Sequence, residues 1–247
     1  MKALIVGYGF VGKATEYLLQ KTGKFDEIII QDPALGYNNK DAEVDYTFIS
    51  VPTPLVNGQL DVTLLQKVYK EYIKRNPVII RSTIGPDQVY LFNEATIMPE
   101  FLREKSWKAD VDSDDMPFVI GFPVESPDFD FVELFSHIKK PWIVEARLAS
   151  MFKLARNASL AMRVALANDF YEISKEFDVD QVMLTDMLET DPWVGGTHWT
   201  VPGPDGNLGF GGNCFPKDLT HMASLCYNLH NPMEVALRQN SLRRNKT

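Results

Sequence analysis

A glycine-rich turn between a short apolar run and a helical pattern constrains the fold of this chain more than any other feature. The apolar run is "ALIV" (3–6), and "GYGFVG" then places Gly7, Gly9 and Gly12 in the spacing G-x-G-x-x-G. Asp32 closes the second predicted strand about twenty residues later. Glycines at this spacing permit a tight turn and a close approach of the backbone to a pyrophosphate, which then meets helix N–H groups. The arrangement predicts a dinucleotide-binding half.

Asp32 indicates which dinucleotide would bind. Its carboxylate would accept hydrogen bonds from the ribose hydroxyls of adenosine and repel a 2′-phosphate, which favours NAD over NADP. Phe10 and Val11, inside the motif, are predicted to belong to the same NAD-binding turn. The other interpretation is a glycine turn in a different α/β protein, in which Asp32 only ends a strand. The order of strand, glycines, helix, strand and acid favours the cofactor.

The first part of the chain alternates short β-rich runs with helical patterns. The predicted strands are 3–6, 27–31, 46–51, 77–82, 95–98, 117–122 and 141–146. Helical patterns between them cover 10–23, 62–75 and 128–138. Strands separated by helices of this length predict an α/β fold with a Rossmann-type, doubly wound parallel sheet.

From about Arg147 the chain becomes helical. Residues 146–177 contain no proline or glycine, are rich in Ala and Leu, and repeat apolar residues at three and four, which predicts one long helix. Shorter helices are expected at 179–189 and 217–229, with a Gly/Pro-rich loop at 195–213. The expected domains are an NAD-binding domain over 1–145 and an all-α dimerisation domain over 146–247. Apolar residues on more than one face of the long helix predict a homodimer through this half.

Composition excludes several classes of protein. The 247-residue chain, 45% of it hydrophobic, can bury a substantial core. A net charge of −8 argues against a nucleic-acid partner, which usually requires a basic patch. No apolar run approaches the ~20 residues of a membrane span. Two cysteines are too few for a disulfide framework, so a cytoplasmic location is expected. The histidines show no metal-ligand spacing, and no metal is expected.

A cysteine lies between a glycine-rich turn and a proline in "GFGGNCFPKDL" (209–219). Glycines let the backbone bend where a side chain would clash, and proline at the first helical position suits a helix that begins there. Cys214 would then lie at a helix N-terminus, where the helix dipole and Lys217 both favour thiolate over thiol. This setting favours a nucleophile. The other interpretation is a small buried hydrophobe, which Cys226 is expected to be.

Six short motifs occur in order over almost the whole chain. They are "GYGFVG", "SVPTP" (50–54), "RSTIGP" (81–86), "MPEFLRE" (98–104), "KLARNASLA" (153–161) and "GFGGNCFPKDL". Together they resemble the UDP-glucose/GDP-mannose dehydrogenase family of nucleotide-sugar dehydrogenases. Such enzymes oxidise a sugar C6 alcohol twice, to a carboxylate, and consume two NAD. The resemblance implies that the cysteine captures an aldehyde-level intermediate, that a second hydride transfer gives a thioester, and that hydrolysis releases the acid.

The matching positions imply catalytic roles in the helical half. Cys214 resembles the nucleophile. Lys153 and Asn157 lie four apart, hence on one face of the long helix, and could stabilise the oxygen that becomes negative. The alternative is an exposed Lys–Asn pair on a solvated helix. Asp218 could orient Lys153 or a water, or could complement a helix N-terminus.

Further roles follow from the motifs of the first half. We expect Glu100 to activate water during thioester hydrolysis, Glu104 to face the nicotinamide, and Thr83 to hold a catalytic water. The expected cofactor-binding residues are Gly7, Gly9, Phe10, Val11, Gly12, Asp32, Val51, Pro52, Thr53, Ser82, Glu104 and Lys217. The expected substrate contacts are Phe101, Leu102 and Gly211.

Several positions depart from the family pattern. Met98 stands where an asparagine is usual, and Ser150 where a glutamate is common. "STIGPDQ" varies the usual proline–glycine turn, and "PDGNL" (204–208) enlarges the loop before the cysteine. These departures concern the sugar nucleotide, for which UDP-glucose, GDP-mannose and N-acetylated UDP-sugars all stay open.

Family members usually carry a second α/β domain after the helical one, which closes over the nucleotide part of the substrate. The sequence ends at Thr247, inside a helical pattern, so this UDP-binding domain is expected to be absent. Two hypotheses follow, an active short dehydrogenase and an impaired NAD-binding dimerisation module or one part of a split enzyme. A third is a dehydrogenase of the 6-phosphogluconate or 3-hydroxyacid type, which does not need "GGNCFPKD".

Overall fold

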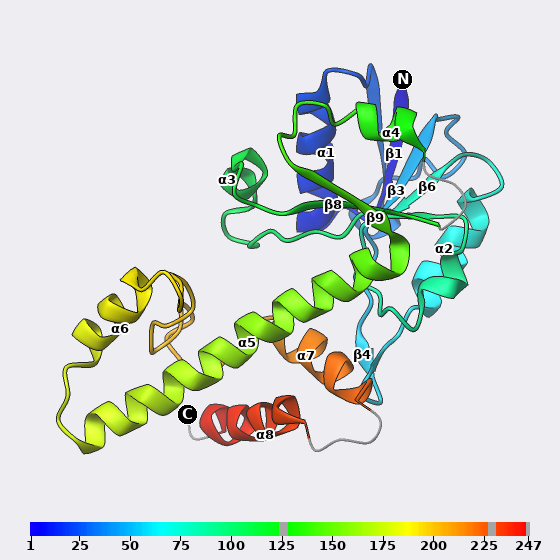
Figure 1. Ribbon diagram of the computed structural model, residues 1–247. Helices are drawn as coiled ribbons and strands as arrows, with labels where there is room; N and C mark the ends of the chain where they lie inside the picture. Colours follow the sequence, from blue (N-terminus) through cyan, green and yellow to red (C-terminus); the bar gives the residue numbers. More distant parts are fainter. Residues whose placement is uncertain (124–127, 227–230, 246–247) are drawn as a thin grey trace. The chain divides into compact units, whose positions relative to one another are not determined.

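The computed structural model describes residues 1–123, 128–226 and 231–245 (Figure 1). The chain divides into two compact units. The first unit comprises Met1–Pro54 and Leu60–Lys153, and the second comprises Leu55–Gln59 and Leu154–Thr247. The domain boundary expected after residue 145 falls where helix α5 (Ala146–Glu176) begins, and this helix continues from the first unit into the second.

A seven-stranded sheet with the order β2-β1-β3-β6-β7-β8-β9 forms the first unit. Its strands are β1 (Lys2–Val6), β2 (Glu27–Gln31), β3 (Tyr46–Ile49), β6 (Val78–Ile80), β7 (Thr96–Ile97), β8 (Phe118–Phe122) and β9 (Pro141–Glu145). Neighbouring strands of this sheet are parallel except β7 and β8, which run antiparallel. The sheet is therefore mostly parallel, and β1 lies between β2 and β3, as at the switch point of a doubly wound fold.

Both faces of this sheet are buried. Side chains alternate along a strand, so Leu4 belongs to one hydrophobic cluster and the adjacent Ile5 to the other. The helices of this unit are α1 (Phe10–Thr22), α2 (Thr63–Tyr72), α3 (Trp107–Asp112) and α4 (Phe129–Glu133), with short 3-10 turns η1 (Pro33–Leu35) and η2 (Val89–Phe92). Figure 1 shows α1 and α2 on opposite sides of the sheet, where Leu18 and Leu65 enter the two clusters. Burial on both faces explains the continuous apolar runs.

Three local elements differ from the sequence-based expectation. The helix expected over 128–138 is shorter, because α4 begins after Asp128, whose carboxylate accepts from the N–H of Phe131, and ends at Glu133. Helix α3 was not expected. A separate hairpin of β4 (Leu55–Val56) and β5 (Gln59–Leu60) was not expected either.

Helices α5, α6 (Gln181–Thr190), α7 (Phe215–Ser224) and α8 (Pro232–Arg244) build the second unit. Ala158, Ala161 and Ala165 of α5 share a cluster with Leu219 of α7 and Ala236 of α8. Small side chains on α5 allow the neighbouring helices to pack closely against it. The helix expected over 217–229 begins two residues earlier and ends at Ser224, and positions 227–229 of that expectation lie outside the described residues.

Candidate active site

Five neighbouring parallel strands end at one edge of the sheet, and the expected cofactor residues follow those ends. Gly7 follows β1, Asp32 follows β2, Thr53 and its neighbours follow β3, Ser82 follows β6, and Glu100 follows β7. The carboxyl ends of parallel strands are where open α/β sheets bind their ligands. The topology therefore gathers residues from five separate parts of the sequence at one edge.

The three glycines of the turn after β1 differ in what a side chain would meet at each position. Gly7 has φ +87°, and a Cβ there would lie 2.8 Å from the carbonyl oxygen of Ser50. A Cβ on Gly12 would overlap the carbonyl oxygen of Gly7. A Cβ on Gly9 would meet nothing within 4 Å, so this position borders open space. Helix α1 starts at Phe10 without a side-chain cap and without an acid in its first turn. Its N–H groups therefore suit a pyrophosphate.

Replacing Gly12 by alanine should destabilise the first unit by about 1–3 kcal/mol, because the new Cβ overlaps backbone that cannot swing away. Urea unfolding measures the change. Gly9→Ala is the matched control, since its Cβ has free space. Equal unfolding free energies for the two variants would contradict this packing.

Asp32 is held in place at the end of β2. Its carboxylate accepts from the N–H of Tyr8 at 2.7 Å and from the N–H of Ala34 at 3.2 Å. The rings of Tyr8 and Tyr37 meet edge to face with centroids 5.9 Å apart. Tyr37 pairs through its backbone with Asp32, so this aromatic pair lies beside the acid. Sequence reasoning missed Tyr37, because only the fold pairs the two positions.

The loops after β3 and β6 are joined by buried hydroxyl groups. Thr53 donates to the carbonyl of Thr83 at 2.8 Å, and Ser82 donates to the carbonyl of Val51 at 2.7 Å. Val51 and Thr53 are buried, and Pro52, which lies between them in the sequence, is exposed. The structure thus brings together the residues expected from the two motifs "SVPTP" and "RSTIGP".

A buried ion pair joins the "PEFLRE" motif to α5. The Lys153 ammonium lies 3.2 Å from Glu100 Oε1, and the two residues are only 3% and 6% exposed. The second oxygen of Glu100 accepts from the N–H of Leu102 at 2.7 Å. Lys153 also lies 5.6 Å from the centre of the Phe101 ring. This burial excludes the alternative of a solvated lysine. Glu104, farther along the loop, is exposed.

A second buried cation, Arg81, was missed by the sequence reasoning. It donates to the carbonyl of Met98 at 3.0 Å and to the Thr15 hydroxyl at 3.2 Å. Burial lowers the pKa of Arg81 to about 10, and the charge of Glu100 opposes that change. The sequence held a signal for a buried arginine, because Arg81 directly follows the apolar run "PVII". That run forms the central strand β6, so the arginine at its end is buried in the sheet.

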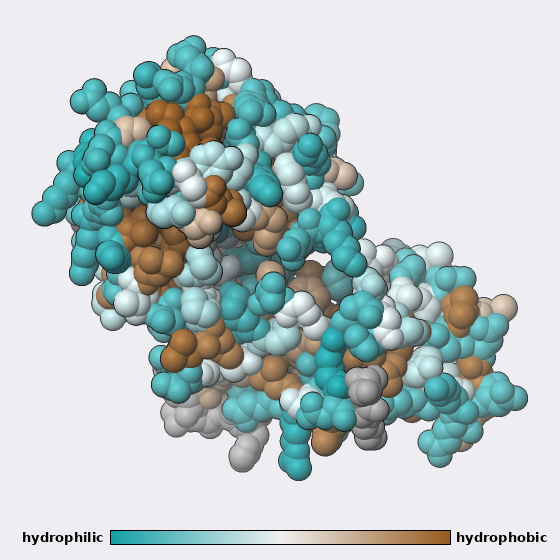
Figure 2. Space-filling view, turned by 180° about the vertical axis from the view of Figure 1, so that it is seen from behind, coloured by the Kyte–Doolittle hydropathy of each residue, from teal (hydrophilic) through white to brown (hydrophobic). Residues whose placement is uncertain are grey.

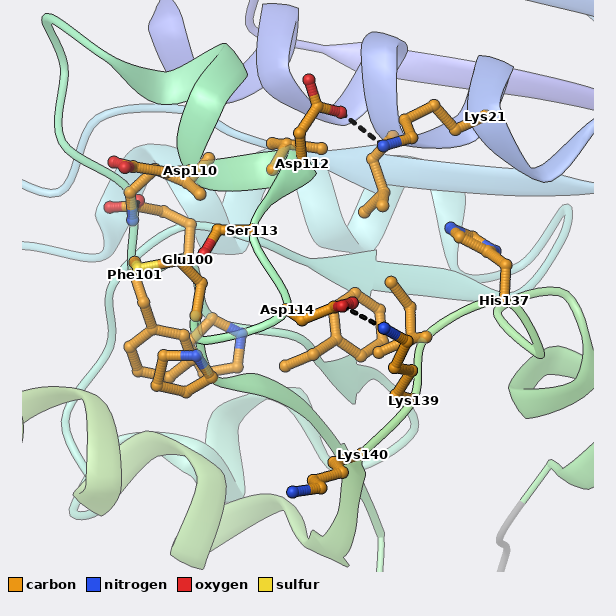
Figure 3. Close-up of a pocket in the computed structure, with 18 of the residues that line it drawn as sticks. Lys21, Glu100, Phe101, Asp110, Asp112, Ser113, Asp114, His137, Lys139 and Lys140 are labelled. Carbon is orange, nitrogen blue, oxygen red and sulfur yellow. Dashed lines mark hydrogen bonds and ion pairs between the residues drawn. The ribbon is translucent and has the colours of Figure 1, made fainter.

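Glu100 and Arg81 also line a cavity of about 140 Å³ in the first unit. Figure 3 shows Glu100 and Phe101 on one side of it, and Lys21 and His137 on the other. Lys21 pairs with Asp112, and Lys139 pairs with Asp114 (Figure 3). These two ion pairs largely balance the charges on the side of the cavity that faces Glu100.

In the second unit, Cys214 is the residue immediately before α7 and is half-buried. The expected helix N-terminus is therefore present, with Phe215 first and Pro216 second rather than first. The cysteine side chain makes no capping hydrogen bond to the helix. Gly211, upstream, lies where a Cβ would overlap the guanidinium of Arg244.

Asp218, in the first turn of α7, is fully buried between two donors. Its carboxylate accepts from the Asn157 amide at 2.6 Å and from the Lys217 ammonium at 2.7 Å. Asp218 was expected to orient Lys153 or a water, or to complement a helix N-terminus. The described contacts place Asn157 and Lys217 on it, and it is the acid in the first turn of α7. Lys153 pairs with Glu100. Lys217, an expected cofactor-binding residue, forms an ion pair with Asp218 inside its own helix turn.

The described residues include three of the four histidines, His137, His198 and His221. No group of three or more His, Cys, Asp or Glu side chains gathers there as metal ligands. Within the same residues, no helix has both the length and the apolar character to cross a membrane.

Comparison with known proteins agrees with the motifs. The model of the UDP-glucose/GDP-mannose dehydrogenase family, central domain, matches residues 147–246. UDP-glucose 6-dehydrogenase AglM of Haloferax volcanii is 29% identical in an alignment that is 230 residues long and covers 81% of this chain and 49% of the relative. UDP-glucose 6-dehydrogenase YwqF of Bacillus subtilis is 25% identical in an alignment that is 287 residues long and covers 95% of this chain and 64% of the relative.

A solved structure shares the fold. The UDP-glucose dehydrogenase of the archaeon Pyrobaculum islandicum superimposes with a TM-score of 0.81 at 20% identity, over 99% of this chain and 68% of that one. The chain spans about half of the length of AglM and about two thirds of YwqF. The matches run through both units, so this chain belongs to the UDP-glucose/GDP-mannose dehydrogenase family, with residues 147–246 as its central domain.

Proposed function

We propose that this chain carries the NAD-binding and cysteine-bearing parts of a nucleotide-sugar 6-dehydrogenase. Its reaction would oxidise the C6 alcohol of UDP-glucose, or of a related sugar nucleotide, to the carboxylate. One observation carries the proposal. Charged and amide groups at the motif positions are buried and paired, as Lys153 with Glu100 and Asn157 with Asp218, although burial of such groups is costly. Active sites are where such arrangements are found.

NAD fits the residues after the strand ends. The N–H groups at the start of α1 would hold the pyrophosphate, Asp32 would bind the adenosine ribose, and Val51, Pro52, Thr53 and Ser82 would border the rest of the cofactor. Bound NAD would supply the hydride acceptor. Asp32 disfavours the 2′-phosphate of NADP because both groups are negative.

The first oxidation needs a stabilised oxygen anion at C6. The Lys153 ammonium and the Asn157 amide would donate to it as the alcohol loses its proton and a hydride leaves the carbon. Asp218 would hold Asn157 in one orientation through its 2.6 Å hydrogen bond. Phe101, Leu102 and Gly211 would contact the sugar nucleotide. Glu104 would face the nicotinamide, and Lys217 would complete the charge around Asp218.

The second oxidation passes through the cysteine. The Cys214 thiolate would add to the aldehyde carbon and form a C–S bond, and loss of a second hydride would leave a thioester. A water held by Thr83 would then attack the acyl carbon while Glu100 accepts its proton. The C–S bond would break and release the thiolate with the sugar carboxylate. The sum is one alcohol, two NAD⁺ and one water converted to one carboxylate, two NADH and three protons.

Turnover tests the proposal directly. The chain is incubated with NAD and, in turn, UDP-glucose, GDP-mannose and N-acetylated UDP-sugars, and NADH absorbance is followed. We expect two NADH for each sugar acid formed, and no comparable rate with NADP. A folded sample that binds NAD but turns over none of these substrates would reject activity of the chain by itself.

A second candidate function is an NAD-binding module or one part of a split enzyme. Substrate binding energy from remote groups positions the reacting carbon, and closure over the substrate excludes water. Adding the C-terminal nucleotide-binding domain of a relative as a separate protein distinguishes the two functions. Activity that appears only after this addition would identify a split enzyme.

The helical half has the exposed apolar surface that a homodimer needs. Large apolar side chains at the end of α5 and along α6 are exposed, among them Phe177 at 69%, Met183, Met187 and, in the loop after α6, Trp193 at 94%. Figure 2 shows hydrophobic patches on a mostly hydrophilic surface. We propose that a second copy covers the α5–α6 surface. Cys214 and Cys226 form no disulfide, which suits a cytoplasmic location.

Light scattering should give twice the chain mass for the native protein. The double variant Phe177→Glu/Met187→Glu should give the single mass, because it places charges in the proposed interface. A matched variant at the exposed Tyr90 of the first unit, Tyr90→Glu, should stay dimeric. A native protein that is monomeric at high concentration would reject the dimer.

A further inference from the structure

The backbone that leads into Cys214 is held by one amide side chain of α8. The N–H of Phe210 donates to Asn240 Oδ1 at 2.7 Å, and the Asn240 amide donates back to the carbonyl of Phe210 at 2.9 Å. Asn240 therefore satisfies both polar backbone groups of a buried residue located four positions before the cysteine. An unpaired buried amide or carbonyl is costly, so this double contact determines where Phe210 can lie.

Neighbouring side chains hold Gly209 in the same way. Its N–H donates to Asn168 Oδ1 of α5 at 2.8 Å, and its carbonyl accepts from the Arg244 guanidinium at 3.4 Å. Asn168 is buried, and its own amide donates to the carbonyl of Val164 at 2.8 Å, which settles the orientation of the acceptor oxygen. Two consecutive residues of the loop are thus anchored to α5 and α8.

The glycines of this loop are required by the same contacts. Gly209 has φ +74°, and a Cβ on it would overlap the Asn240 amide oxygen. Gly212, with φ +75°, has free space around it and gives the segment between Phe210 and Cys214 little stiffness of its own. Without the anchors on Gly209 and Phe210, the approach to the cysteine would be poorly defined.

We propose that Asn240 is a positioning residue for Cys214, supported by Asn168. The proposal rests on the proposed function, in which Cys214 is the nucleophile. The anchored loop on one side and α7 on the other keep the sulfur at the helix N-terminus, because Phe210 and Leu219 of α7 pack in one cluster. A nucleophile misplaced by about 1 Å can lose about 10²-fold in rate.

Cysteine alkylation tests the position of the sulfur independently of turnover. The proteins are the native chain, Asn240→Leu, which loses both hydrogen bonds, and Asn240→Asp, which keeps only the acceptor. Gln239→Leu, an exposed amide one residue earlier on α8, is the matched control. Each is treated with iodoacetamide, and the peptides that contain Cys214 and Cys226 are quantified by mass spectrometry. Cys226 reports any general loosening of the unit.

We expect Asn240→Leu to slow alkylation of Cys214 about two- to fivefold, the size of a helix-dipole contribution, with Cys226 unchanged. In turnover, kcat should fall about 10²-fold while NAD affinity stays the same. Asn240→Asp should lie between Asn240→Leu and the native chain, which keeps the test valid if the leucine variant does not fold. Equal alkylation of Cys214 in the Asn240 and Gln239 variants, or a parallel change at Cys226, would overturn the proposal. A native chain without turnover would bear on the proposed function alone.

Discussion

Replacing Cys214 by alanine is expected to lower the formation of sugar acid by about 10⁴-fold or more, because no covalent intermediate can form. NAD affinity should be unchanged, since the glycine turn and Asp32 belong to the first unit and Cys214 to the second. NADH absorbance measures turnover, and calorimetry measures NAD binding. During turnover the native protein should carry an acyl group on Cys214 that mass spectrometry can detect, and the variant should lack it.

Cys226→Ala is the matched control for this experiment. Its sulfur contacts only the carbonyl of Met222 at 3.9 Å among the hydrogen bonds of the described residues, and it has no part in the proposed reaction. Its turnover should equal that of the native chain. Comparable rates for Cys214→Ala and Cys226→Ala would reject a covalent mechanism while leaving NAD binding in place.

Replacing Lys153 by methionine should have two separable effects. The variant leaves the Glu100 carboxylate buried without its ammonium partner, which should lower the free energy of unfolding by about 3 kcal/mol. It also removes a donor to the oxygen anion, which should lower kcat by about 10²- to 10³-fold. Urea unfolding and initial rates measure the two effects.

The double variant Lys153→Met/Glu100→Gln separates structure from catalysis. A neutral amide no longer needs a buried cation, so stability should largely return. Activity should not return, because the proposed donor Lys153 and the proposed base Glu100 are both replaced. Lys2→Met, at the exposed Lys2–Glu27 pair, should change neither property appreciably. If activity recovers together with stability in the double variant, Lys153 is a structural residue and its proposed catalytic role is wrong.

Local features of the sequence determined much of the first unit. Strand 3–6 and helix 10–23 were predicted within one or two residues, because apolar runs and the glycine turn are encoded by neighbours in the chain. The long helix was predicted over 146–177 and observed over Ala146–Glu176 for the same reason. The antiparallel step between β7 and β8 and the β4–β5 hairpin were not predicted, since pairing between strands is not a local property.

The partners of the site residues were decided by the tertiary structure. The sequence by itself indicated Lys153, Glu100, Asn157 and Asp218 through their motifs, yet it left the partner of Asp218 open between Lys153, a water and a helix N-terminus. The structure pairs residues that lie 53 and 61 positions apart, Lys153 with Glu100 and Asn157 with Asp218. Residue type and spacing specify which groups carry charge. Only the packing of distant segments determines which charges are buried together, because a buried charge is stable only where the fold supplies its partner.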